Sequence, residues 1–92
     1  IATIFLDRAM RIKRYTPPTT GIFNIISSDI GRPLAHVTHL LAPDHFELDA
    51  AEALRTLKTI EREVTSTDNR VFLARTLPYR TIEDKIEGVV LA

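Results

Sequence analysis

The most constraining feature of the sequence is the alternating pattern of its last third, residues 60–92. Charged residues alternate there with apolar or β-branched ones, and Asn, Asp and Gly separate the alternating segments. This pattern is typical of antiparallel strands joined by turns. A sheet of two or three strands is only marginally stable in water by itself, so another part of the chain must cover one face of the meander. The pattern predicts strands at Ile60–Thr67, Val71–Thr81 and Gly88–Leu91, joined by turns at Asp68–Arg70 and Ile82–Gly88.

The start of the chain predicts another hairpin. Ile1–Leu6 is a continuous apolar and β-branched run, which is typical of a strand buried on both faces. A turn at Asp7–Met10 and a strand with one polar face at Arg11–Thr16 follow it.

Short helical segments are expected after this hairpin. Thr16 and Pro17 suit the N-cap and the first position of a short helix. Ser27–Asp29 suits a single turn that stops at Gly31.

Two longer helices are expected before the final meander. Pro33 would open the first and Pro43 would end it, whereas Asp44 and Glu47 have the spacing of a capping box at the start of the second. Their apolar faces would consist of Leu34, Val37, Leu40 and Leu41 in the first helix and of Leu48, Ala51, Leu54 and Leu57 in the second.

These elements indicate one α+β domain spanning residues 1–92. Strand hairpins that are segregated from helices favour a five-stranded antiparallel sheet with short helices covering one face. The chain starts and ends within strand patterns and has no initiator Met. We therefore expect a domain excised from a longer protein.

The composition excludes several classes of function. Twelve acidic residues balance 12 basic ones, so the chain lacks the net positive charge of a domain that binds nucleic acid or an anionic membrane. The absence of Cys excludes disulfides, Cys-ligated zinc and iron–sulfur clusters. No apolar run approaches the roughly 20 residues that span a bilayer. We expect a cytoplasmic location.

Several local sequences resemble the PAS domain family. Phe5–Arg8 and Tyr15–Pro17 are similar to the family's opening hairpin and the start of its first helix. Asp29–Leu34 is similar to its D-x-G-R-P-L link between short helices. The resemblance covers nearly the whole chain and implies a sheet in which the first strand lies beside the last.

One subgroup of the family resembles this chain in particular. Arg75–Thr81 (R-T-L-P-Y-R-T), together with Glu61–Val64 and Gly88–Leu91, resembles the PAS domains of CheB/CheR (methylesterase/methyltransferase) fusion proteins and of hybrid histidine kinases. The resemblance implies a non-catalytic sensory module of a chemotaxis-type or two-component signalling protein. It also implies a homodimer, and an output module that follows Ala92 in the parent chain and carries any methyltransferase, methylesterase or histidine kinase activity.

No metal is expected, whereas the cofactor stays open, because non-covalent flavin binding is not excluded. Flavin-binding light sensors of this fold form their photoadduct on a Cys, which this chain lacks. His36 and His39 share the i, i+3 spacing of metal ligands, but with His45 they offer no fixed third ligand, so we favour solvated or capping histidines. Haem is not expected, because neither His39 nor His45 lies in a motif typical of its ligand. No residue has a recognisable catalytic setting.

The candidate site is a small apolar cavity between the sheet and its helices. Arg62 or Arg75 would anchor a carboxylate ligand if its side chain faced the cavity. We favour cross-strand ion pairs of both arginines with neighbours such as Glu61 and Glu63. The candidate lining comprises Phe23, Ile26, Leu34, Val37, Leu40, Arg62, Leu73, Arg75 and Val90.

Three hypotheses about function remain open. The first is a sensor that binds a small ligand, and the second is a ligand-free dimerisation spacer. A void well below about 300 Å³ would favour the spacer. The least favoured hypothesis, a small enzyme, requires a cleft with strongly perturbed titratable groups.

Overall fold

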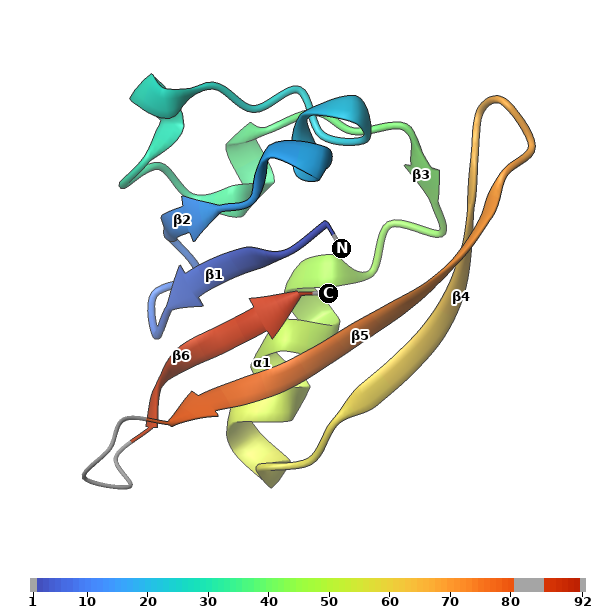
Figure 1. The fold of residues 1–92 in the computed structure, drawn as a ribbon. Helices are drawn as coiled ribbons and strands as arrows, with labels where there is room; N and C mark the ends of the chain where they lie inside the picture. Colours follow the sequence, from blue (N-terminus) through green and yellow to red (C-terminus); the bar gives the residue numbers. More distant parts are fainter. Residues whose placement is uncertain (1, 81–85, 92) are drawn as a thin grey trace.

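The computed structural model describes residues 2–80 and 86–91, which form an antiparallel sheet with helical segments on one face (Figure 1). Six strands are seen in these residues, in the order β2-β1-β6-β5-β4-β3. The strands are β1 (Ile4–Asp7), β2 (Ile12–Tyr15), β3 (Leu41–Ala42), β4 (Ile60–Ser66), β5 (Val71–Arg80) and β6 (Ile86–Leu91). The helical segments are α1 (Phe46–Thr56) and the 3-10 turns η1 (Pro17–Gly21), η2 (Ser27–Asp29) and η3 (Leu34–His36).

The first and last strands are neighbours at the centre of the sheet, as the family resemblance implied. Leu6 pairs with Val89, and both side chains are almost fully buried. A Cβ added to Gly88 would lie 1.9 Å from the carbonyl oxygen of Leu6. Glycine at this position is therefore what allows β1 and β6 to approach each other.

The strand and turn predictions for the final meander are confirmed where the structure describes them. The turn after Ser66 contains Asn69 with φ of 65°, a conformation that Asn tolerates better than most residues. Most of the expected turn at Ile82–Gly88 lies outside the described residues, as do Ile1 and Thr81. The last strand begins at Ile86 rather than at Gly88.

The prediction of five strands is corrected by β3, an edge strand of two residues. Leu41 and Ala42 pair with Ser66 and Thr65 of β4, in a segment expected to be helical up to Pro43. The helix is replaced by the single turn η3 because later backbone groups have partners elsewhere. The N–H of Leu40 donates to the carbonyl oxygen of Ile22 at 3.1 Å, and the Ala42–Pro43 peptide bond is cis.

The expected face and cap of the long helix are also corrected. Helix α1 begins at Phe46 with His45 as N-cap and no side-chain capping bond, so Asp44 and Glu47 form no capping box. Its buried residues are Phe46, Asp49, Ala50 and Ala53, while Leu48 is 71% exposed. The two alanines bring α1 close to the sheet, where it contacts β4, β5 and β6.

The D-x-G-R-P-L segment has a structural role. The Asp29 carboxylate accepts hydrogen bonds from the N–H of Ile26 at 2.9 Å and from the Arg32 guanidinium at 3.1 Å. These contacts hold the pKa of Asp29 below its ordinary value, with the Ile26 bond as the largest cause. Gly31, with φ of 91°, donates its N–H to the carbonyl oxygen of Ile12 at 2.7 Å and so ties the segment to β2.

The 3-10 turn η1 starts where the sequence predicted, with Thr16 at the N-cap position, but the Thr16 side chain makes no capping hydrogen bond. The Thr16 hydroxyl oxygen instead accepts the N–H of Thr3 at 2.9 Å. Buried Thr19 donates its hydroxyl to the carbonyl oxygen of Thr3 at 3.2 Å. Both threonines therefore attach η1 to the residues before β1.

Candidate functional site

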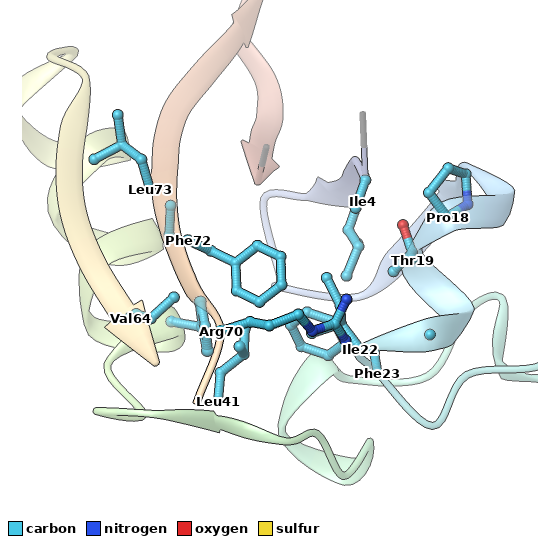
Figure 2. Close-up of a pocket in the computed structure, with 14 residues that line it drawn as sticks. Ile4, Pro18, Thr19, Ile22, Phe23, Leu41, Val64, Arg70, Phe72 and Leu73 are labelled. Carbon is cyan, nitrogen blue, oxygen red and sulfur yellow. The ribbon is translucent and has the colours of Figure 1, made fainter. Parts of the chain in front are cut away.

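An apolar cavity of about 440 Å³ lies between η1 and the inner face of the sheet (Figure 2). Strands β1, β4 and β5 contribute one wall, η1 and the residues after it contribute the opposite wall, and β3 and α1 close one end. The lining residues are Ala2, Ile4, Pro18, Thr19, Gly21, Ile22, Phe23, Leu41, Phe46, Val64, Arg70, Phe72, Leu73 and Ala74.

Two of the lining residues are small and leave their share of the cavity unfilled. Ala74 on β5 and Gly21 in η1 both belong to the lining, and a Cβ added to Gly21 would meet no atom within 4 Å. The hydroxyl of Thr19 already donates to Thr3. The cavity wall therefore offers apolar contact and few free hydrogen-bonding groups.

Arg70 is the charged residue among the 14 that line the cavity. Its side chain starts at the β4–β5 turn and extends past the Phe72 ring toward Ile22 (Figure 2). The guanidinium carbon lies 5.4 Å from the Phe72 ring centroid. Nε donates to Asp68 at 2.8 Å. Within the described part of the chain, neither terminal nitrogen of Arg70 has a hydrogen-bond partner.

The carboxylate of Asp68 is held by two neighbours. The Ser66 hydroxyl donates to one oxygen and Arg70 Nε donates to the other. The Ser66 bond is the largest cause of a lowered pKa of Asp68, and the charge of Arg70 adds to it. Asp68 is thus ionised at neutral pH and orients the guanidinium at one edge.

Phe23 and Phe46, which line one end of the cavity, pack against the ring of His39. The His39 ring lies 5.1 Å from both the Phe23 and Phe46 rings, measured between centroids. His39 Nδ1 accepts the N–H of Leu41 at 3.1 Å, and Nε2 lies 3.2 Å from a carboxylate oxygen of Asp44. Because Nδ1 is an acceptor, the ring proton resides on Nε2. The ring therefore joins β3 to the start of α1.

The other histidines do not join His39. His36 and His45 are exposed, and no group of three or more potential ligands that would hold a metal occurs among the described residues. No described helix is long and apolar enough to cross a membrane.

The two candidate arginines have different partners. Arg75 lies opposite Glu61 in the strand register and its Nε lies 3.5 Å from that carboxylate, which is the expected cross-strand pair. Arg62 instead donates two hydrogen bonds to Asp49 of α1, at 2.8 and 2.9 Å. The pKa of Arg62 is raised, chiefly by this bond. A sequence pattern on one strand does not reveal a partner on a helix.

The candidate lining residues are distributed over several parts of the molecule. Phe23 lines the cavity, and Leu73 borders it although its side chain points to the opposite face of β5 (Figure 2). Leu34 and Val37 are buried beside a smaller hollow near His39. Ile26 and Leu40 are exposed by 62% and 46% and lie outside the cavity lining.

Val90 is a separate case. The register places its backbone opposite Phe5 and Leu77, but its side chain lies outside the described residues.

Sequence reasoning missed Arg70, Phe72 and Ala74 as lining residues. Both alternating sets of β5 begin with apolar side chains, Val71 and Leu73 on one face and Phe72 and Ala74 on the other. The pattern alone therefore does not distinguish the inner face. The available signal was Val64, which is apolar between Glu63 and Thr65 on β4 and pairs with Phe72.

The sequence model of the PAS domain family matches residues 1–92. A 104.1 kDa uncharacterised protein encoded in the hypE 3′ region of Rhodobacter capsulatus is 34% identical over 91 residues, which is 99% of this chain. The match spans 10% of that relative's length.

Among solved structures, the chain is similar to the PAS domain of histidine kinase ThkA. The TM-score is 0.75 at 21% identity, over 99% of this chain and 96% of the other. A selenomethionine variant of that domain gives a TM-score of 0.70 at 20% identity, with the same coverage of 99% and 96%.

Proposed function

The chain belongs to the PAS domain family, and we propose that it is the sensory module of a signalling protein, without catalytic activity of its own. Its proposed action is to bind a small apolar ligand between η1 and the sheet. The alternative is a ligand-free dimerisation spacer of the same fold, because a fold does not specify a function.

The cavity volume is the observation that favours a sensor over a spacer. At about 440 Å³ it exceeds the roughly 300 Å³ at which ordinary ligand sites begin. An apolar hollow of this size suits a small ligand, whereas a spacer does not require one.

The position of the cavity supports a route for a signal. Ile4 and Phe72 line it from β1 and β5, the two strands between which β6 lies. Ile4 pairs with Leu91 near the end of β6. A ligand that prefers one spacing of β1 and β5 would shift the population of β6 positions, and we propose that this shift reaches a C-terminal output module.

The proposal extends to the parent protein. The histidine kinase that carries the similar ThkA domain supports a two-component or chemotaxis-type parent, and the R-T-L-P-Y-R-T segment supports the CheB/CheR-fusion and hybrid-kinase subgroup. We propose a cytoplasmic homodimer. Val71 and Leu73, exposed by 60% and 55% on the outer face of β5, support contact with a second copy.

Ligand binding is tested with prodan, a neutral naphthalene dye whose fluorescence rises and shifts in apolar surroundings. Two variants add bulk to opposite faces of β5. Ala74→Leu fills the cavity, and Val71→Leu enlarges an exposed side chain. We expect saturable binding to the wild type and to Val71→Leu, and its loss in Ala74→Leu. Native mass spectrometry of the freshly purified protein would add any ligand that is retained.

A wild-type chain that shows neither saturable dye binding nor a retained small molecule would favour the spacer. Binding that survives in a folded Ala74→Leu variant would place the dye somewhere other than this cavity, and would also contradict the proposal.

A further inference from the structure

We propose that the ligand of this cavity is an amphipathic monocarboxylate, with its apolar body against the sheet and its carboxylate on Arg70. The inference rests on the proposed function and specifies the chemical class of the ligand.

The apolar part of the ligand follows from the cavity wall. Apart from Arg70 and Thr19, the lining side chains are hydrocarbon or aromatic, and the Thr19 hydroxyl already donates to Thr3. A sugar or another polar molecule would lose its bonds to water without replacement, at a large cost in free energy. An aliphatic or aryl body loses nothing of this kind.

The acidic part of the ligand follows from the free side of Arg70. Asp68 occupies Nε, so the two terminal nitrogens remain as a pair of donors in the plane of the guanidinium. That pair matches the two oxygens of a carboxylate. The Arg70 side chain extends along Phe72 toward Ile22 (Figure 2), which places the donors beside the apolar volume rather than in open solvent.

Asp68 limits the strength of this preference without removing it. Its carboxylate accepts from Ser66 and from Nε of Arg70, so its charge is directed to the opposite edge of the guanidinium. Because the Arg70 side chain is 59% exposed, water screens the attraction. We therefore expect a preference of about tenfold for an acid over a neutral analogue, in the lower part of the range for charge-assisted bonds.

The test compares octanoate with octanamide, which share an apolar chain and differ in charge. Each competes with prodan for the wild type, for Arg70→Met and for the matched control Arg75→Met. Arg75 is an exposed arginine of β5, the strand that begins one residue after Arg70, and it is paired with Glu61 and absent from the cavity lining. We expect octanoate to displace the dye at about tenfold lower concentration than octanamide in the wild type and in Arg75→Met. In Arg70→Met the two concentrations become similar.

A second measurement uses the wild type alone. Raising the ionic strength weakens octanoate binding and leaves octanamide binding nearly unchanged, because only the acid has a charge to screen.

Each alternative outcome has one meaning. Equal displacement by octanoate and octanamide in the wild type overturns the inference, while the proposed function stands. A preference for octanoate that persists in Arg70→Met has the same consequence. Absence of both saturable prodan binding and any retained small molecule overturns the proposed function and the inference with it.

Discussion

The two ends of the helical layer cover the sheet in opposite ways. Under α1, Ala50 and Ala53 are fully buried and the helix contacts β4, β5 and β6 closely. Under η1, the same sheet face borders a cavity of about 440 Å³. Small residues occur in both places, so residue size alone does not produce a void.

The difference arises from how each cover is attached. Helix α1 is drawn to the sheet by the paired hydrogen bonds between Asp49 and Arg62. The turn η1 is attached at one edge, where Thr19 bonds to Thr3, and it bridges toward β3 without a side chain that fills the gap. A regular helix with an ion pair gives a packed core, whereas short turns attached at their ends leave room for a ligand.

The largest expected effect on stability comes from adding a methyl group where β1 and β6 are in close contact, compared with adding one beside the cavity. Gly88→Ala places a Cβ against the carbonyl oxygen of Leu6, so β1 and β6 must separate, and we expect a loss of more than about 2 kcal/mol in the free energy of unfolding. Gly21→Ala, beside the cavity, should change it by less than about 1 kcal/mol. Urea denaturation followed by circular dichroism measures both. Similar losses in the free energy of unfolding would show that the β1–β6 contact and the edge of the cavity tolerate an added methyl group equally.

The next largest difference in stability should come from enlarging one alanine under α1 and one alanine beside the cavity. Ala50→Leu overpacks the contact of α1 with the sheet and should cost about 1–3 kcal/mol. Ala74→Leu adds the same volume to the cavity and should change stability by less than about 1 kcal/mol, because the space is already there. The same denaturation experiment compares them. A larger loss for Ala74→Leu would mean that the cavity is not open in solution.

The ion pair that holds α1 should have a moderate effect. Asp49→Asn removes the charge that binds Arg62, and we expect the thermal midpoint to fall by several degrees. Glu52→Gln breaks the exposed pair of Glu52 with Arg55 on the same helix and should leave the midpoint nearly unchanged. Differential scanning fluorimetry measures both. An equal shift in the two variants would contradict the assigned role of the Asp49–Arg62 pair.

The smallest expected effect is a pH dependence of stability at Asp29, in the short turn η2. The pKa of Asp29 is lowered by the Ile26 N–H and the Arg32 guanidinium, so its carboxylate stabilises the fold above its ordinary pKa of 3.8. This contribution is lost as the pH falls through the lowered pKa of the folded state.

Thermal midpoints measured from neutral pH into the acid range test this dependence. Asp29→Asn should be less stable than the wild type near neutral pH, and the difference should shrink in acid. Glu63→Gln, a change at an exposed carboxylate of β4, should show no such convergence. A difference between Asp29→Asn and the wild type that stays constant with pH would exclude the carboxylate charge as its cause.

Much of the fold was predictable because its signals are local. The alternation in β4 and β5, the Asn69 turn and the D-x-G-R-P-L segment each depend on residues close in sequence. The candidate site was less predictable. Phe23 was identified from its place in an apolar segment, but Ile26 is exposed and Arg70 was not considered as a ligand contact.

Long-range contacts account for these misses. Leu41 entered a strand because β4 offered partners, and Asp49 became a buried helix residue because Arg62 lies beneath it. Neither partner is marked in the local pattern. In the sequence Arg70 looks like an ordinary turn residue. Only the folded chain places Ile22 and Phe72 beside it.

The sequence by itself determined the strands of the meander, the family and the absence of Cys chemistry, since these depend on composition and on neighbouring residues. The tertiary structure alone decided which face of β5 is covered, which arginine meets a helix and which one meets the cavity. A period of two assigns side chains to two faces without saying which face is inside. That choice is made only when η1 and α1 pack against the sheet, and it leaves Arg70 beside an apolar space.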